Sequence, residues 1–113
     1  MRFRTALCTL VTAALPLWAH AVLLEGTPKA GTAVTGPAFP VNLRFNSRID
    51  ARRSRLSLVD ASGEEQPLSL TQSAPDTVTA HALGAKPGRS RIRWQVLSSD
   101  GHITRGEFQF QVQ

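Results

Sequence analysis

Two groups of residues, one near each end of the chain, carry side chains suited to binding a metal ion. His20 follows an N-terminal apolar segment, and Asp100 and His102 flank Gly101 near the C-terminus. A cut before His20 would give that residue two donors, its imidazole and a new α-amino group. Asp100 and His102 add a carboxylate and a second imidazole. Three nitrogens and one oxygen suit a square-planar or tetragonal Cu(II) ion, so the sequence predicts one such site.

The pair Asp100 and His102 is a weak signal when taken alone. Residues i and i+2 of an extended segment point to the same side, so the two side chains are expected to lie together at a strand end. Gly101 between them permits a tight turn. Asp-Gly is also an ordinary turn dipeptide, so the case for a metal depends on His20 joining the pair.

The N-terminal segment has the pattern of a secretory signal. Arg2 and Arg4 provide positive charge, and the mainly apolar stretch 6–17 is too short to span a bilayer. Small residues stand at Ala19 and Ala21. Cleavage after Ala21 fits the local pattern better and would discard His20, whereas cleavage after Ala19 would make His20 the N-terminus.

The charge and cysteine content limit the possible classes of protein. The formal charge is +5, and loss of Arg2 and Arg4 leaves +3, which favours solubility and does not by itself indicate nucleic-acid binding. The densest basic cluster, 52–55, is interpreted either as a solvated loop and strand edge or as a docking patch for a membrane partner. The only cysteine, Cys8, lies in the signal, so a cleaved domain has no disulfide and depends on apolar packing.

The rest of the chain has the alternating pattern of an all-β domain. Short apolar-polar runs are separated by turn residues, and no stretch shows a helical period. About seven strands are predicted, which favours an immunoglobulin-like Greek-key β-sandwich or partly closed barrel. They are expected at 21–27, 39–45, 56–58, 68–70, 76–83, 92–96 and 108–112.

Several of these segments resemble one family. The opening 20–23 with the Thr-Pro-Lys-Ala-Gly turn at 27–31, the strand 41–45, and the stretch 93–112, which contains Ser-Ser-Asp-Gly-His, are similar to the CopC family of periplasmic copper-binding proteins. The similarity covers essentially the whole chain after the signal.

The resemblance implies a signal peptide at 1–19 and a copper-binding domain at 20–113. It maps the family's Cu(II) ligands onto His20, Asp100 and His102, and it favours cleavage before His20. It further implies an exported, periplasmic, monomeric copper carrier or buffer for copper resistance or homeostasis, which is not an enzyme. The implied partner is an inner-membrane copper transporter of the CopD type.

The chain departs from the family at two points. Many members have a methionine-rich loop for Cu(I), but the only methionine here is Met1. Some members place a glutamate near the Cu(II) site where this chain has Ser47, a poor ligand, so a water is expected in the axial position. The remaining histidine, His81, is expected to face solvent on a strand.

Two other functions stay open on the sequence alone. An N-terminal histidine with a second histidine also describes the histidine brace of copper oxygenases. This chain has no tyrosine, which those enzymes often use as an axial ligand, and a carboxylate in the copper plane would leave less room for oxygen chemistry. If cleavage removes His20, the chain is instead expected to be a structural β-sandwich without a metal.

Overall fold

The third strand shows how the sequence determines the fold. The computed structural model describes residues 21–113. In it β3 (Phe39–Phe45) alternates between buried and exposed residues along its whole length. Neighbouring side chains of a strand point to opposite faces, so the four apolar residues of β3 enter the core and the residues between them face solvent. The strand expected at 39–45 is confirmed.

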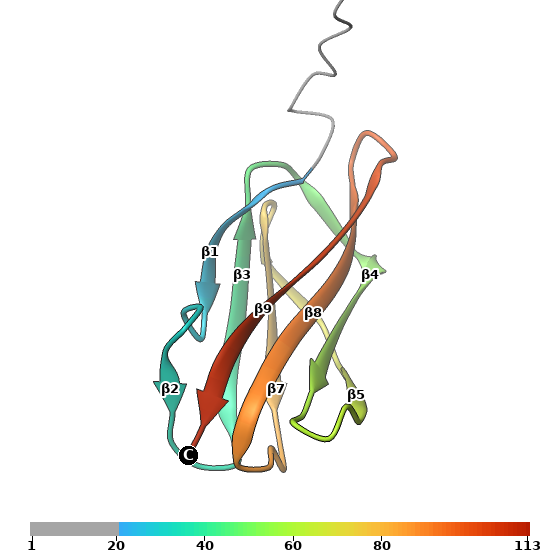
Figure 1. The fold of residues 1–113 in the computed structure, drawn as a ribbon. Coiled ribbons are helices and arrows are strands. Elements are labelled where there is room, and N and C mark those ends of the chain that lie inside the picture. Colours follow the sequence, from blue (N-terminus) through green and yellow to red (C-terminus); the bar gives the residue numbers. More distant parts are fainter. Residues whose placement is uncertain (1–20) are drawn as a thin grey trace, which may run out of the picture.

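The described residues form nine strands in two packed sheets (Figure 1). One sheet has the order β1-β3-β7-β6 and the other the order β2-β9-β8-β4-β5. No helix of residues 21–113 is long and apolar enough to cross a membrane. Besides β3 the strands are β1 (Leu23–Thr27), β2 (Ala33–Val34), β4 (Ile49–Val59), β5 (Glu65–Leu68), β6 (Thr71–Ala74), β7 (Thr77–Ala82), β8 (Gly88–Ser98) and β9 (Ile103–Val112).

The chain crosses between the sheets after β1, β2, β3, β5 and β7, so consecutive strands often belong to different layers. This confirms the predicted all-β Greek-key sandwich. There are nine strands rather than about seven for two reasons. The two-residue β2 is too short to show an alternation. The single strand expected at 68–70 instead marks the end of β5 in one sheet and the connection to β6 in the other.

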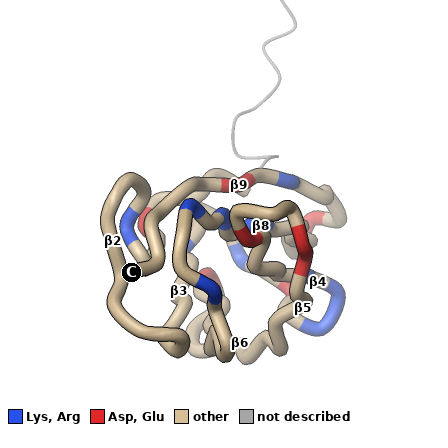
Figure 2. The backbone as a smooth tube through the Cα atoms, turned by 60° about the horizontal axis from the view of Figure 1, so that its bottom comes forward, with Lys and Arg blue, Asp and Glu red and all other residues tan. Residues whose placement is uncertain are grey.

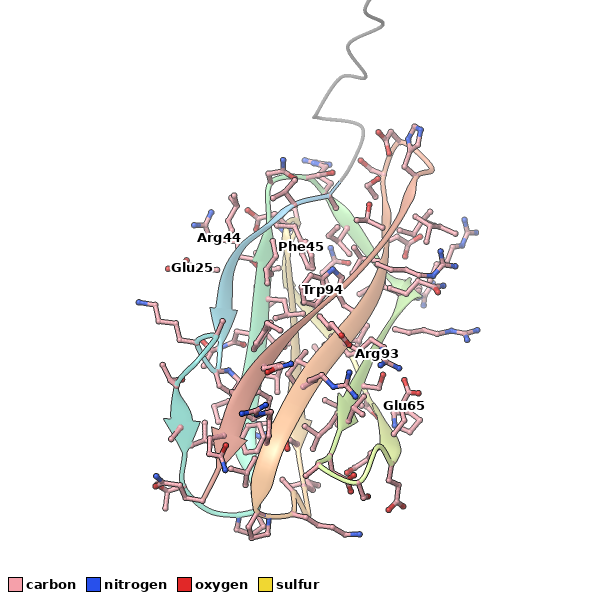
Figure 3. All side chains as sticks on the ribbon, viewed as in Figure 1. Glu25, Arg44, Phe45, Glu65, Arg93 and Trp94 are labelled. Carbon is pink, nitrogen blue, oxygen red and sulfur yellow. The ribbon has the colours of Figure 1, made fainter. Side chains whose placement is uncertain are left out.

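The core lies between the sheets and is closed by aromatic contacts. Phe45 of one sheet meets Trp94 of the other edge to face, with ring centroids 6.1 Å apart (Figure 3). Trp94 also packs against Phe108 at 6.0 Å and lies over Gly106, its partner on β9. Trp94 is therefore a buried residue of the core.

A large bulge interrupts β4 beside β8. Asp50 pairs with Leu97, yet Arg55 pairs with Gln95, so residues 51–54 lie opposite a single residue of β8. Ser54 holds the bulge in place, because its hydroxyl donates to the Asp50 carbonyl at 2.7 Å and accepts from the Leu97 N–H at 3.0 Å. The bulge breaks the alternation before residue 56, which explains why the sequence predicted only the segment 56–58.

Candidate metal centre

The hairpin between β8 and β9 positions Asp100 and His102. The N–H of Ser98 donates to the His102 carbonyl at 2.9 Å, and the N–H of Gly101 donates to the Ser98 carbonyl at 2.9 Å. Gly101 has a φ of 92°, a left-handed conformation that favours glycine. These features describe a three-residue loop closed by a glycine bulge. Asp100 and His102 therefore belong to a tight turn rather than to an extended strand end.

The turn brings the two proposed ligands together. The Nδ1 atom of His102 lies 3.2 Å from Oδ2 of Asp100, and both side chains are about half exposed. The expectation that the pair lies on one side is confirmed, although the cause is the turn and not the alternation of a strand. A carboxylate beside a ligating imidazole fixes its tautomer and orientation.

The local hydrogen bonds keep the Asp100 carboxylate ionised. The Ser98 hydroxyl donates to Oδ1 of Asp100, and the backbone N–H of His102 donates to the same atom at 3.2 Å. The Ser98 hydroxyl and then the His102 N–H hold the pKa of Asp100 below its ordinary value, and partial desolvation opposes them. The site therefore offers a negative, oriented oxygen donor near neutral pH.

The start of the described chain lies beside this hairpin. The N–H of Ala21 donates to the Thr104 hydroxyl at 3.2 Å, and Ala21 is buried. The next residue is fixed on both sides: the Val22 N–H donates to Oδ1 of Asn46 at 2.8 Å, and the Asn46 N–H donates to the Val22 carbonyl at 3.0 Å. Thr104 follows His102 by two residues on β9. The backbone next to His20 is therefore anchored close to the hairpin.

His20, the third proposed ligand, lies outside the described residues. Within 21–113 no group of three histidine, cysteine, aspartate or glutamate side chains is placed to hold a metal ion. His81 is exposed on β7, as expected. Ser47 lies half-buried in the β3–β4 loop next to Asn46, and its hydroxyl donates to the Arg48 carbonyl. Asp100 and His102 thus supply at most two ligands between them.

Sequence reasoning did not identify the residues that support the pair. Ser98 holds the carboxylate, and Thr104 and Asn46 hold the N-terminal backbone. Ser98 had a usable signal, because serine at the first position of a turn often bonds the backbone or side chain two residues on. No local sequence pattern indicated Thr104 or Asn46, because their partners Ala21 and Val22 are distant in sequence.

Comparison with known proteins gives consistent results. A family model described as the CopC domain matches residues 23–113. Protein YobA of Escherichia coli K12 is 28% identical over 99% of this chain and 94% of its own. Copper resistance protein C of Xanthomonas campestris pv. juglandis is 27% identical over 97% of each chain.

Solved structures agree with these relatives. The crystal structure of CopC from Methylosinus trichosporium OB3b superposes with a TM-score of 0.73 at 30% identity, covering 82% of this chain and 93% of that one. PcoC, a methionine-rich copper resistance protein from Escherichia coli, shares the fold, with a TM-score of 0.62 at 23% identity over 83% of this chain and 99% of its own. With its sandwich fold and a family match that extends from β1 to the C-terminus, this chain belongs to the CopC family.

Proposed function

We propose that this protein is an exported copper carrier or buffer that serves copper resistance or homeostasis in the periplasm and catalyses no reaction. Residues 1–19 are removed as a signal peptide, and the domain 20–113 binds one Cu(II) ion. The ligands are the amine and imidazole of His20, the Asp100 carboxylate and the His102 imidazole. Amine and imidazole of one N-terminal histidine close a chelate ring, and the metal displaces the proton of the amine at neutral pH.

One observation carries this proposal: the hydrogen bond from the Ala21 N–H to Thr104. Ala21 directly follows His20, and Thr104 is two residues beyond His102 on the same strand. A single peptide unit then separates the anchored backbone from the two donors of His20. This supports a site between the N-terminus and the β8–β9 hairpin, where Asp100 and His102 are already in contact.

The relatives support copper as the cargo, because two of them are named as copper resistance proteins. The donor set supports Cu(II) as its oxidation state. The chain after residue 19 contains neither methionine nor cysteine, and soft sulfur ligands are what favour Cu(I). Family resemblance alone supports two further parts of the proposal, a monomeric state and an inner-membrane CopD-type transporter as partner.

The test is Cu(II) binding by the exported protein, whose N-terminal residue should be His20. The wild type is expected to bind one equivalent with a tetragonal electron paramagnetic resonance spectrum showing nitrogen couplings. His102→Ala should weaken binding at least tenfold, on the order of the loss seen for one metal ligand or its support. His81→Ala removes the same imidazole from an exposed strand position and should leave binding unchanged. A chain that begins at Val22, or equal behaviour of both variants, would refute the site.

A further inference from the structure

The outer face of the larger sheet carries an unusual concentration of arginine. On the β4 bulge, on the adjoining strand β5 and on the facing parts of β8 and β9 there are six arginines and only three carboxylates, Asp50, Glu65 and Glu107. The arginines are Arg52, Arg53, Arg55, Arg91, Arg93 and Arg105. Residues 21–113 have eleven Lys and Arg against eight Asp and Glu. These six arginines therefore exceed the three carboxylates by three positive charges.

The carboxylates of this face are already paired. Glu107 contacts Arg93 at 3.2 Å and Arg91 at 3.4 Å, and Glu65 contacts Arg93 at 3.6 Å. Figure 3 shows Arg93 and Glu65 together on the outside of the sheet. Asp50 contacts Arg53 at 3.8 Å. Each negative charge is thus shared with at least one guanidinium, and none remains to neutralise the other arginines.

Three of these six arginines have no carboxylate partner among residues 21–113. The side chains of Arg52 and Arg55 make no ion pair there, and Arg105 donates only to the neutral amide oxygen of Gln95 at 2.9 Å. All three are exposed. Like charges held close together repel, and the fold gains nothing from that repulsion. An anionic partner would relieve it.

These three arginines line one groove. The groove runs over β4, β5, β8 and β9, and Arg93, Pro67 and Leu70 also line it. It lies beside the β4 bulge, where the register shifts between Asp50 and Arg55, and it extends past the short strand β5 to Leu70. In Figure 2 the basic stretch of β4 projects at the edge of the molecule, beside β5.

We infer that this arginine groove docks an acidic segment of a protein partner, a short stretch of chain rich in aspartate and glutamate. Guanidinium groups bind carboxylates through paired, planar hydrogen bonds, which suits the choice of arginine over lysine. The concave shape favours a peptide over a membrane, because a flat lipid surface cannot enter a groove. The inference depends on charge and shape alone and is independent of copper binding.

The test uses a fluorescent peptide of alternating glutamate, aspartate and leucine, with its glutamine and asparagine counterpart as the neutral control. The wild-type protein should bind the acidic peptide more tightly than the neutral one, and added salt should weaken the binding. R55Q/R105Q should weaken it about tenfold or more, as expected when two interface charges are lost. R55K/R105K keeps the positive charge but loses the planar guanidinium groups. Its affinity for the acidic peptide should lie between that of R55Q/R105Q and that of the wild type.

A matched control separates the groove from general attraction. K29Q/R89Q removes the same charge from exposed positions outside the groove and should change affinity less than about twofold, because screening leaves distant charges little influence. Equal losses in both double variants, or equal binding of both peptides, would overturn the proposal. So would binding to phosphatidylglycerol vesicles, with the same dependence on Arg55 and Arg105, in place of peptide binding. Circular dichroism confirms that each variant is folded.

Discussion

At the scale of single residues, Asp100 has two possible roles that a substitution can separate. It contacts His102 through Oδ2 and receives hydrogen bonds from Ser98 and the His102 N–H through Oδ1. As a ligand, Asp100 coordinates copper through a carboxylate oxygen. As a positioning residue, it orients the imidazole of His102. The Ser98 hydroxyl and then the His102 N–H hold the pKa of Asp100 below its ordinary value, so the carboxylate is ionised near neutral pH and available for either role.

Asp100→Asn should therefore weaken Cu(II) binding less than His102→Ala and should alter the spectrum, because an amide keeps the size of the side chain and loses its charge. Ser98→Ala provides the control, since it removes the hydroxyl that holds Oδ1 and leaves both proposed donors in place. We expect Ser98→Ala to lower affinity by a few fold without changing the donor set. A spectrum of Asp100→Asn identical to that of the wild type would assign Asp100 a positioning role only.

At the scale of strands, the sequence was informative where alternation is regular and uninformative where it is not. The strand expected at 39–45 matches β3 because each apolar residue there is buried. The first half of β4 was not predicted, since four residues of its bulge lie opposite one residue of β8. The contact of Asp100 with His102 was predicted from spacing, but the anchoring of Ala21 on Thr104 joins residues too far apart in sequence to be inferred from any local pattern.

The pairing of β8 with β9 depends on Gly106. A Cβ at this position would lie 2.7 Å from Cε2 of Trp94 and closer still to Cζ2, so the ring occupies the space of a side chain. Gly106→Ala should reduce the free energy of unfolding by about 1–3 kcal/mol, the usual cost of overpacking a core. Urea denaturation, monitored by circular dichroism, measures this change in the free energy of unfolding. If the clash is with Trp94, the same substitution should cost less in a Trp94→Phe background, and purely additive losses would rule that contact out as the cause.

At the scale of the whole molecule, the two surfaces proposed here lie at different parts of one rigid sandwich. The β8–β9 hairpin and the first described residues form one end, and the arginine groove crosses the outer face of the larger sheet. Both use β8 and β9: the hairpin joins the two strands, and Arg93 and Arg105 project from them into the groove. A partner held in the groove would thus contact the same pair of strands that present the proposed ligands.

The preference for one oxidation state of copper depends on the whole chain, because it is set by the donor atoms that the chain contains after residue 19. That part of the sequence has no sulfur, and its three histidines are His20, His81 and His102. Amine, imidazole and carboxylate donors suit Cu(II) better than Cu(I). Reduction should therefore lower copper affinity by orders of magnitude and release most of the metal, rather than move it to a second site.

A competition titration measures this release. The mature protein loaded with one Cu(II) is reduced without oxygen in the presence of a Cu(I)-specific chelator, and the chelator should take up nearly all the copper. The same protein kept oxidised, with a Cu(II) chelator of known affinity, provides the control for tight binding before reduction. Retention of one Cu(I) per protein would contradict the prediction and point to a second set of ligands. His81 is the residue to substitute first in that case, because it is an exposed imidazole on β7, to which the proposed site assigns no role.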